Sequence, residues 1–186
     1  MHIIGGDNIN KKRLVVVVDF QNDFVTGSLG FPKAKDIEEH ICKKIKEYRE
    51  NGDEIAFTFD THDDSYMESQ EGKNLPIPHC IKGTQGWELY GCAKDLIADG
   101  DKRFEKGAFG SIEFFDYLRE RDYESIELAG LVTNICIISN AILAKTALPE
   151  VEVIVDADCV ASADDAINEK TLDVLEGLHV KVVGRK

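Results

Sequence analysis

The amino-acid sequence predicts an α/β fold in which a doubly wound parallel sheet lies between two layers of helices. Strand-like and helix-like segments alternate along the 186 residues, as they do in chains built from βα units. The first strand-like segment, residues 13–20, is a nearly continuous β-branched run, which is typical of a central parallel strand buried on both faces. No repeat, low-complexity stretch or linker interrupts the alternation, so we expect one domain, residues 1–186.

Each predicted element has a local reason in the sequence. The strands are short apolar or β-branched runs, and we expect them at residues 13–20, 54–60, 102–106, 125–129, 151–156 and 179–183. The helices carry apolar residues at helical spacing, and we expect them at residues 34–50, 87–98, 111–121, 134–143 and 163–175. Asn51 and Gly52 close the first helix, Ser111 caps the third, and Thr133 or Asn134 caps the fourth.

Composition limits the partners and the compartment that we expect. The formal net charge of -13 repels phosphate backbones and anionic lipids, so neither nucleic acid nor a membrane is an expected partner. No signal peptide is evident, and no apolar run is long enough to span a membrane. Five cysteines are scattered without Cys-x-x-Cys pairs, so we expect no disulfide framework and a reducing, cytoplasmic location. They are Cys42, Cys80, Cys92, Cys136 and Cys159.

Ligands of doubly wound sheets bind beyond the carboxyl ends of the strands, so polar residues at those ends are the candidates for chemistry. They are Asp19, Asp60 with His62, Lys106, Cys136 and Asp158.

Cys136 follows a strand and falls in the first turn of a predicted helix. The free N–H groups and positive end of that helix should lower the thiol pKa from its usual value of about 8.5 and could hold an oxyanion. Asp19 could take the thiol proton, and the ammonium of Lys106 could orient both groups. The ordinary alternatives are a buried apolar cysteine, a loop-capping Asp19 and a solvated Lys106.

A second candidate group lies in and beside the long polar loop at residues 61–86, a length that usually indicates a functional or mobile segment. Asp60, His62 and His79 form a carboxylate and two imidazoles, which commonly bind zinc, iron or manganese. Glu71 or Glu68 could add an oxygen ligand. The alternative is that these are ordinary polar loop residues.

The order of several short motifs resembles the isochorismatase-like cysteine hydrolases, and most closely their nicotinamidase branch. The motifs are Val18-Asp19-Phe20-Gln21-Asn22-Asp23-Phe24, Asp60-Thr61-His62, Pro78-His79-Cys80, Phe104-Glu105-Lys106-Gly107-Ala108-Phe109 and Gly130-Leu131-Val132-Thr133-Asn134-Ile135-Cys136.

The resemblance implies a three-layer fold with six parallel strands in the order 3-2-1-4-5-6. It implies a catalytic triad of Asp19, Lys106 and Cys136, with a divalent metal held by Asp60, His62 and His79. It further implies a cis peptide at Leu131-Val132, an oxyanion hole from the backbone N–H groups of Val132 and Cys136, and stacking of Phe24 on a pyridine ring.

One departure concerns the walls of the substrate site. Many relatives carry an aromatic residue three positions before the second metal histidine, where this chain has Pro76. Phe109, Tyr66 or another chain could supply the missing wall. Glu71 matches the variable fourth ligand better than Glu68 does.

The reaction implied by the resemblance is hydrolysis of nicotinamide to nicotinate and ammonia, a step of NAD salvage, by a homo-oligomer that is a dimer or larger. An alternative is a related hydrolase of another small amide, carbamoyl or ureido compound. A non-enzymatic alternative is a receiver-like signalling domain, which would need an acidic cluster that Val18 and the lone Asp19 do not provide. No Gly-x-Gly-x-x-Gly follows the first strand, which disfavours a plain nucleotide-binding domain.

Overall fold

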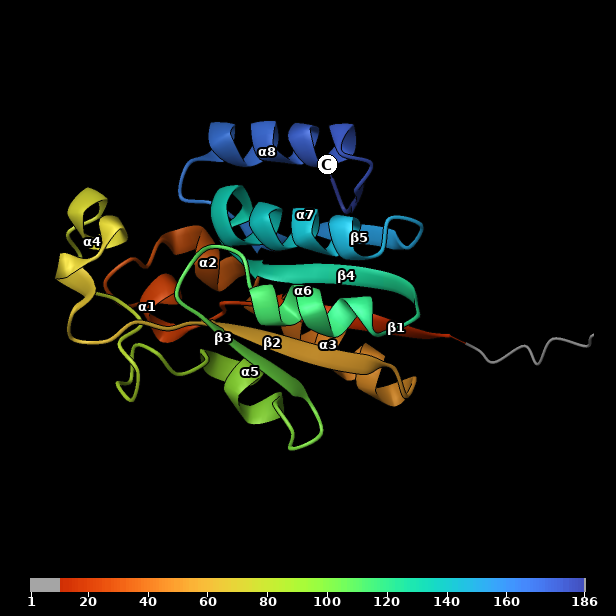
Figure 1. Cartoon of the computed structure of the whole chain (residues 1–186), viewed down its shortest axis with the longest axis horizontal. Coiled ribbons are helices and arrows are strands. Elements are labelled where there is room, and N and C mark those ends of the chain that lie inside the picture. The colour runs from red at the N-terminus through yellow and green to blue at the C-terminus, as the bar shows by residue number, and fades with distance from the viewer. Residues whose placement is uncertain (1–10, 186) are drawn as a thin grey trace, which may run out of the picture.

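The computed structural model describes residues 11–185, and in this part of the chain six parallel strands form one sheet (Figure 1). The strand order is β3-β2-β1-β4-β5-β6, which confirms the predicted fold class and order. The strands are β1 (Lys12–Val18), β2 (Glu54–Asp60), β3 (Lys102–Lys106), β4 (Tyr123–Leu131), β5 (Glu152–Ala161) and β6 (Lys181–Val183).

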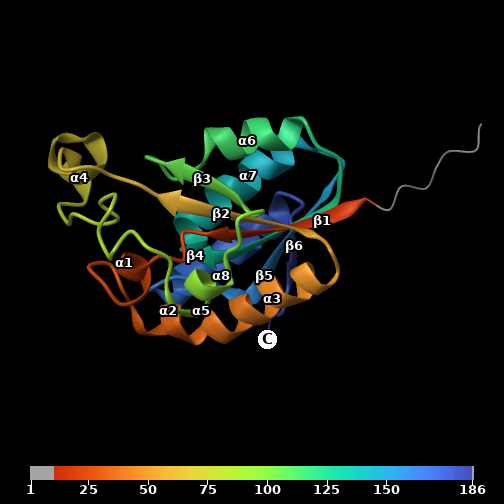
Figure 2. The same cartoon turned by 90° about the horizontal axis from the view of Figure 1, so that it is seen from below.

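Helices cover both faces of the sheet because the central strand is apolar on both sides (Figure 2). Leu14, Val16 and Val18 pack in a core with α6, α7 and α8, whereas Val15 and Val17 pack in a second core with α3 and α5. The helices are α1 (Asn22–Val25), α2 (Pro32–Asp36), α3 (Glu38–Glu50), α4 (Gln70–Asn74), α5 (Gly91–Leu96), α6 (Ile112–Arg119), α7 (Ile138–Ala147) and α8 (Asp165–Gly177). Among the described residues, none of these helices has the length and apolar character that crossing a membrane requires.

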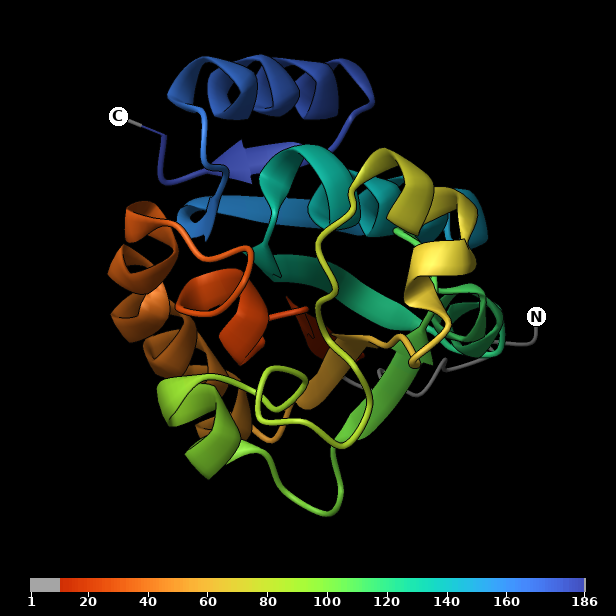
Figure 3. The same ribbon diagram turned by 90° about the vertical axis from the view of Figure 1, so that its left-hand side faces the viewer.

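The carboxyl ends of the central strands meet at one rim of the sheet, which Figure 3 views face-on with α1 and α4 in front. Val18 pairs with Gly130 across β1 and β4, and Asp60 pairs with Lys106 across β2 and β3. Gly130 has φ +120°, and a Cβ there would lie 2.0 Å from the carbonyl oxygen of Val18. Only glycine allows the two strands to approach this closely at the rim.

Two of the predicted helices differ from those observed. The helix expected at residues 34–50 is divided into α2 and α3, because Pro32 starts a separate short helix at its first turn. The helix expected at residues 87–98 begins only at Gly91. Residues 87 and 88 lie in a turn instead. Leu89 and Tyr90 are extended, since Leu89 pairs with Gln21 and the N–H of Tyr90 donates to the carbonyl of Phe20.

The turn after β4 also differs from the prediction. It opens with a π-helix, η2 (Thr133–Ile137), which continues directly into α7. The residue before η2 is Val132, so the predicted cap at Thr133 or Asn134 is wrong, and Asn134 instead accepts a hydrogen bond from Ser162. The long loop at residues 61–86 contains the 3₁₀ helix η1 (Tyr66–Glu68) and α4.

The expectation that the cysteines form no disulfide framework is wrong for one pair. Cys42 in α3 and Cys92 in α5 form a disulfide, with their Cα atoms 6.1 Å apart. Their separation of 50 residues gives no local signal in the sequence, because only the packing of α5 on α3 brings them together. Cys80, Cys136 and Cys159 are free and buried.

Candidate active site

Three strand ends bring Asp19, Lys106 and Cys136 together at the rim. Asp19 directly follows β1, Lys106 is the last residue of β3, and Cys136 lies in η2 just after β4. Asp19 has φ +46°, a left-handed conformation that is unfavourable for a residue other than glycine and is held here by the surrounding packing. All three side chains are buried, with Asp19 fully enclosed.

Lys106 is the centre of this group. Its Nζ lies 2.7 Å from Asp19 Oδ2, 3.3 Å from Asp60 Oδ1 and 3.6 Å from Cys136 Sγ. Asp19 Oδ1 accepts a 2.6 Å hydrogen bond from the Thr58 hydroxyl. Asp19 Oδ2 makes the ion pair with Lys106, and a carboxylate oxygen has a further lone pair that can accept the proton of a thiol. The structure thus brings together the thiol, the carboxylate and the ammonium that the sequence singled out, and their catalytic roles stay a prediction.

The electrostatics of the thiol differ from the expectation drawn from its helix position. Burial, followed by the charge of Asp19, raises the pKa of Cys136 well above its usual value, and the ammonium of Lys106 opposes this only in part. Burial also raises the pKa of Asp19, against the lowering influence of Lys106. Although burial acts to lower it, the pKa of Lys106 is raised by Asp19 and the other anionic neighbours. These directions favour the protonated form of the Cys136 thiol beside the ion pair of Lys106 and Asp19.

A second group of polar side chains adjoins the first. Asp60 ends β2, and its Oδ2 lies 3.1 Å from His62 Nε2 and 3.3 Å from His79 Nε2. Tetrahedral ligands at metal distances of 2.0–2.1 Å are separated by about 3.3 Å, so this spacing matches a metal site. His79 Nδ1 donates to the carbonyl of Ile77 at 2.8 Å, which leaves the Nε2 lone pair directed at Asp60. A lone pair facing a carboxylate requires a proton or a cation between them, and the donor set therefore fits a divalent metal.

The two glutamates considered as additional ligands lie in different positions. Glu71 in α4 reaches the group, with its carboxylate oxygens 4.0 Å from His62 Nε2 and 3.7 Å from His79 Nε2. Glu68 is exposed on η1. The geometry therefore favours Glu71 as the oxygen donor that could complete the set.

Sequence reasoning assigned no role to two residues that hold this region in place. Gln21 is fully buried, and its side chain donates to the carbonyls of Asp60 and Trp87 while accepting from the N–H of Asp60. Asp23 Oδ2 accepts from the N–H of Cys80, the residue after His79. Both belong to the motif after β1, where attention to polar residues two and four positions beyond Asp19 could have found them.

Comparison with known proteins agrees with this geometry. A family model described as the isochorismatase domain matches residues 13–185. The chain belongs to the isochorismatase family. It is 32% identical over 143 residues to a protein of Bacillus subtilis (strain 168) described as an uncharacterized isochorismatase family protein, PncA, a match that covers 70% of this chain and 77% of that relative.

Solved structures give the same result. A crystal structure of nicotinamidase PncA from Bacillus subtilis is 29% identical, with a TM-score of 0.82 over 92% of this chain and 99% of that one. Pyrazinamidase of Pyrococcus horikoshii in complex with zinc shares the fold, with a TM-score of 0.81 at 23% identity over 94% and 99% of the two chains. These comparisons confirm the predicted family, its nicotinamidase branch and the class of hydrolases that act on amides.

The isochorismatase-family chain also has the backbone feature expected just before the turn that carries Cys136. The Leu131–Val132 peptide bond is cis. The carbonyl of Val132 accepts from the N–H groups of Ile135 and Ile137, which fixes the turn that carries Cys136. Asn140 extends this turn, because its side-chain amide donates to the carbonyls of Cys136 and Phe109 and accepts from the N–H of Ser111.

Aromatic side chains lie around the two histidines. Phe24 packs on His79 with ring centroids 5.5 Å apart, and the Tyr66 ring lies edge-on to both histidines. Phe109 is 49% exposed on the loop before α6. Pro76 is exposed and contributes no aromatic wall, and Tyr66 contacts the histidine group from the side of α4.

Asp158, also singled out at a strand end, lies outside this group. It lines a cavity of about 400 Å³ whose other walls come from α2, α3, α8 and the end of β6. The strand β5 runs five residues beyond the predicted end at Asp156, which carries Asp158 within the strand rather than past it.

Proposed function

We propose that this isochorismatase-family hydrolase is a metal-assisted cysteine amidohydrolase that converts nicotinamide to nicotinate and ammonia through a thioester on Cys136. The observation that carries the proposal is the contact of one buried ammonium, Lys106 Nζ, with Asp19, Asp60 and Cys136. This contact joins the proposed nucleophile and its base to the neighbouring group of Asp60, His62 and His79, here named the metal-type cluster. The similarity to Bacillus subtilis nicotinamidase supports the choice of substrate.

In the proposed reaction, Asp19 takes the proton of the Cys136 thiol, and the sulfur attacks the carboxamide carbon to form an S–C bond. Asp19 then returns the proton to the departing nitrogen as the C–N bond breaks and ammonia leaves. Water attacks the carbonyl carbon of the resulting thioester and gives one proton to Asp19. The C–S bond then breaks, Asp19 returns that proton to the sulfur of Cys136, and the carboxylic acid product leaves. Lys106 keeps Asp19 ionised at rest and stabilises the negative charge that moves to sulfur.

The backbone N–H groups of Val132 and Cys136 would bind the oxyanion of the tetrahedral intermediate. Each such donor typically contributes about 3 kcal/mol to lowering the barrier. Phe24 and Phe109 would hold the aromatic ring of the substrate. The contact of Phe24 with His79 supports a ring position between the metal-type cluster and the thiol.

A divalent metal is part of the proposal, with zinc first and iron or manganese as alternatives. Asp60, His62 and His79 would hold it, and Glu71 would contribute directly or through water. When bound, the metal would position the pyridine nitrogen or a water molecule. The zinc complex of the Pyrococcus horikoshii pyrazinamidase supports zinc as the first choice.

The test is ammonia release from a panel of small amides by the Cys136→Ala variant. We expect turnover of nicotinamide to disappear while metal content stays at the level of the unmodified protein. Cys159→Ala is the matched control, because Cys159 is an equally buried free cysteine in the opposite core. Retained turnover by Cys136→Ala would remove the thiol from the mechanism. Turnover of a carbamoyl or ureido compound in preference to nicotinamide would favour the alternative substrate class.

We also propose a cytoplasmic homo-oligomer, a dimer or larger, that has no nucleic-acid or membrane partner. The net charge of -13 supports the exclusion of anionic partners. Exposed apolar side chains support self-association: Phe109 lies on the loop before α6, Ile112 on α6 and Ile142 on α7. Light scattering on Ile112→Asp should then show a smaller mass than the unmodified chain. An unchanged mass would remove this surface as the interface.

A further inference from the structure

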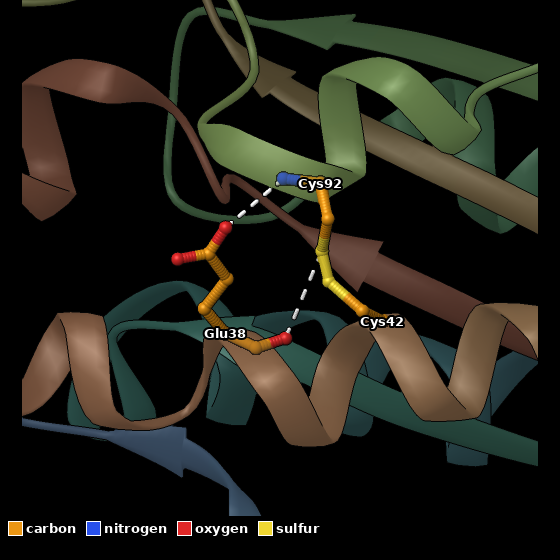
Figure 4. A group of neighbouring side chains, drawn as sticks. All are labelled: Glu38, Cys42 and Cys92. Atoms are coloured by element: carbon orange, nitrogen blue, oxygen red, sulfur yellow. Dashed lines mark hydrogen bonds between the residues drawn. A yellow bond between two sulfur atoms is a disulfide. The ribbon is translucent and has the colours of Figure 1, made fainter.

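The disulfide lies outside the candidate active site but beside a segment that reaches it. Cys42 is in the first half of α3, and Cys92 is the second residue of α5 (Figure 4). Glu38, one turn before Cys42, accepts a 3.0 Å hydrogen bond from the N–H of Cys92 through Oε1. The sulfur of Cys92 lies 3.8 Å from the carbonyl oxygen of Glu38, an acceptor for its proton when the pair is reduced. Glu38 can therefore accept hydrogen bonds from Cys92 in both redox states, from its N–H in either state and from its thiol in the reduced state.

Residues just before Cys92 are bonded to the loop that follows Asp19. The N–H of Tyr90 donates to the carbonyl of Phe20 at 2.8 Å, and the N–H of Asn22 donates to the carbonyl of Glu88 at 2.9 Å. The side chain of Gln21 donates to the carbonyl of Trp87 at 2.8 Å. Residues 87–92, here named the bracing segment, are thus joined to α3 by the disulfide at one end. Hydrogen bonds along their length join them to the loop that follows Asp19.

Gln21 completes the connection to the metal-type cluster. Its amide donates to the carbonyl of Asp60 at 2.9 Å and accepts from the N–H of Asp60 at 2.8 Å. A continuous series of bonded groups therefore runs from Cys92 through the bracing segment and Gln21 to Asp60. This series identifies the groups whose order can change when the covalent link between Cys42 and Cys92 is made or broken.

We propose that Cys42 and Cys92 are a reversible thiol–disulfide site that regulates the affinity of the metal-type cluster for its metal through the bracing segment. The inference rests on the proposed function for the identity of the regulated site. In the oxidised form the covalent link limits the excursions of α5, so Gln21 is held against Asp60. In the reduced form the hydrogen bond of Cys92 to Glu38, that of Arg49 to the carbonyl of Leu96 and packing hold the helix without a covalent link, and the metal ligand Asp60 is less well ordered.

The chemistry needs a small-molecule disulfide as oxidant. One cysteine thiolate attacks a sulfur of that disulfide, which forms a mixed disulfide and releases one thiol. The second cysteine thiolate then attacks the protein sulfur and releases the second thiol. Two electrons pass from the protein to the small disulfide, and the protons of the two cysteines end on the two released thiols. Disulfides in reducing compartments are usually transient or redox-sensing, which fits a reversible role.

Glu38, Cys42 and Cys92 could alternatively bind a metal, since their ligand atoms lie within 4.8 Å of one another. The sulfurs are bonded to each other, so no ion can be shared between them in this state. The two roles exclude each other in the oxidised protein and are separable by experiment in the reduced one.

The experiment equilibrates the full-length protein with glutathione buffers of graded ratio, removes the buffer, and counts free thiols after denaturation. Of the five cysteines, we expect all to react after reduction and three after oxidation, since one pair is then consumed. Zn²⁺ affinity is measured by competition with a chromophoric chelator. We expect reduction to weaken Zn²⁺ binding at the metal-type cluster about fivefold, a change of affinity within the usual range of coupling between two sites. Amide exchange in residues 87–92 should become faster by a similar factor.

Cys42→Ser and Cys92→Ser are the test variants and Cys159→Ser is the matched control. We expect the test variants to show the reduced-state Zn²⁺ affinity and exchange rate in every buffer, while the control responds like the unmodified chain. Equal affinity and equal exchange in both redox states would overturn the proposal and leave the proposed function untouched. A second Zn²⁺ bound by the reduced protein and lost in Cys42→Ser would also overturn it, in favour of a metal site. If Zn²⁺ does not bind at all, the proposed metal site fails, and exchange in residues 87–92 alone decides whether the disulfide braces this segment.

Discussion

The fully buried side chain of Gln21 offers a sharp test of how the candidate site is held. In Gln21→Leu, three backbone groups lose their partner: the N–H and carbonyl of Asp60 and the carbonyl of Trp87. A buried polar group left without a partner costs about 1–3 kcal/mol, and the apolar leucine recovers part of that loss. We therefore expect the free energy of unfolding to fall by about 2–4 kcal/mol, with weaker Zn²⁺ binding at Asp60.

Urea denaturation of the metal-free protein measures this loss without a contribution from bound metal. Asn22→Ala is the control, because the adjacent Asn22 side chain makes one exposed hydrogen bond to the carbonyl of Gln85. The control should lie within about 0.5 kcal/mol of the unmodified chain. If Gln21→Leu were no less stable than Asn22→Ala, the argument that Gln21 holds Asp60 would be refuted.

Four further predictions concern charge and cross-linking. Lys106→Met removes the ammonium that lowers the pKa of buried Asp19. Because the proposed base must be ionised to act, the acid limb of the pH profile of kcat/KM should move up by about one pH unit or more. An acid limb that stays in place would show that Lys106 does not set this pKa. Lys44→Met leaves Glu127 and Asp156 without their shared cation and should cost about 3–5 kcal/mol in chemical denaturation, whereas the exposed-pair control Lys181→Met should cost under about 1 kcal/mol. Although burial opposes it, Lys44 holds the pKa of Asp156 below its ordinary value. This carboxylate therefore stabilises the fold above about pH 4, and the contribution is lost as the pH falls further. Asp156→Asn should flatten that part of the profile of unfolding free energy against pH. Cys42→Ser opens a cross-link between residues 50 apart and should cost about 3–4 kcal/mol under oxidising conditions, a difference that should vanish when the unmodified protein is reduced.

The strands and the triad could be predicted because their signals are local. A β-branched run such as residues 13–20 can be buried on both faces only in the middle of a parallel sheet, and the polar residue that follows it must then lie at the rim. Asp19, Lys106 and Cys136 are each attached to such a strand end, so knowledge of the fold class was enough to group them.

The features that could not be predicted depend on contacts between distant segments. Residues 87–90 have apolar spacing suited to a helix, but residues 87 and 88 form a turn and Leu89 pairs with Gln21. The thiol pKa was predicted to fall because the helix start was considered without its surroundings, whereas burial beside Asp19 raises it. The Cys42–Cys92 pair follows from how α5 lies on α3, which no spacing along the chain encodes.

Asp60 uses its two carboxylate oxygens in different directions, one toward Lys106 and the other toward the two histidines. A single residue therefore belongs to both halves of the site, and neither half can be altered independently. An engineer who replaced Asp60 to change the preference of the proposed metal site for one ion over another would also change the charge next to Lys106, and with it the pKa of Asp19. Variants selected for a new ion should consequently carry compensating changes near Lys106.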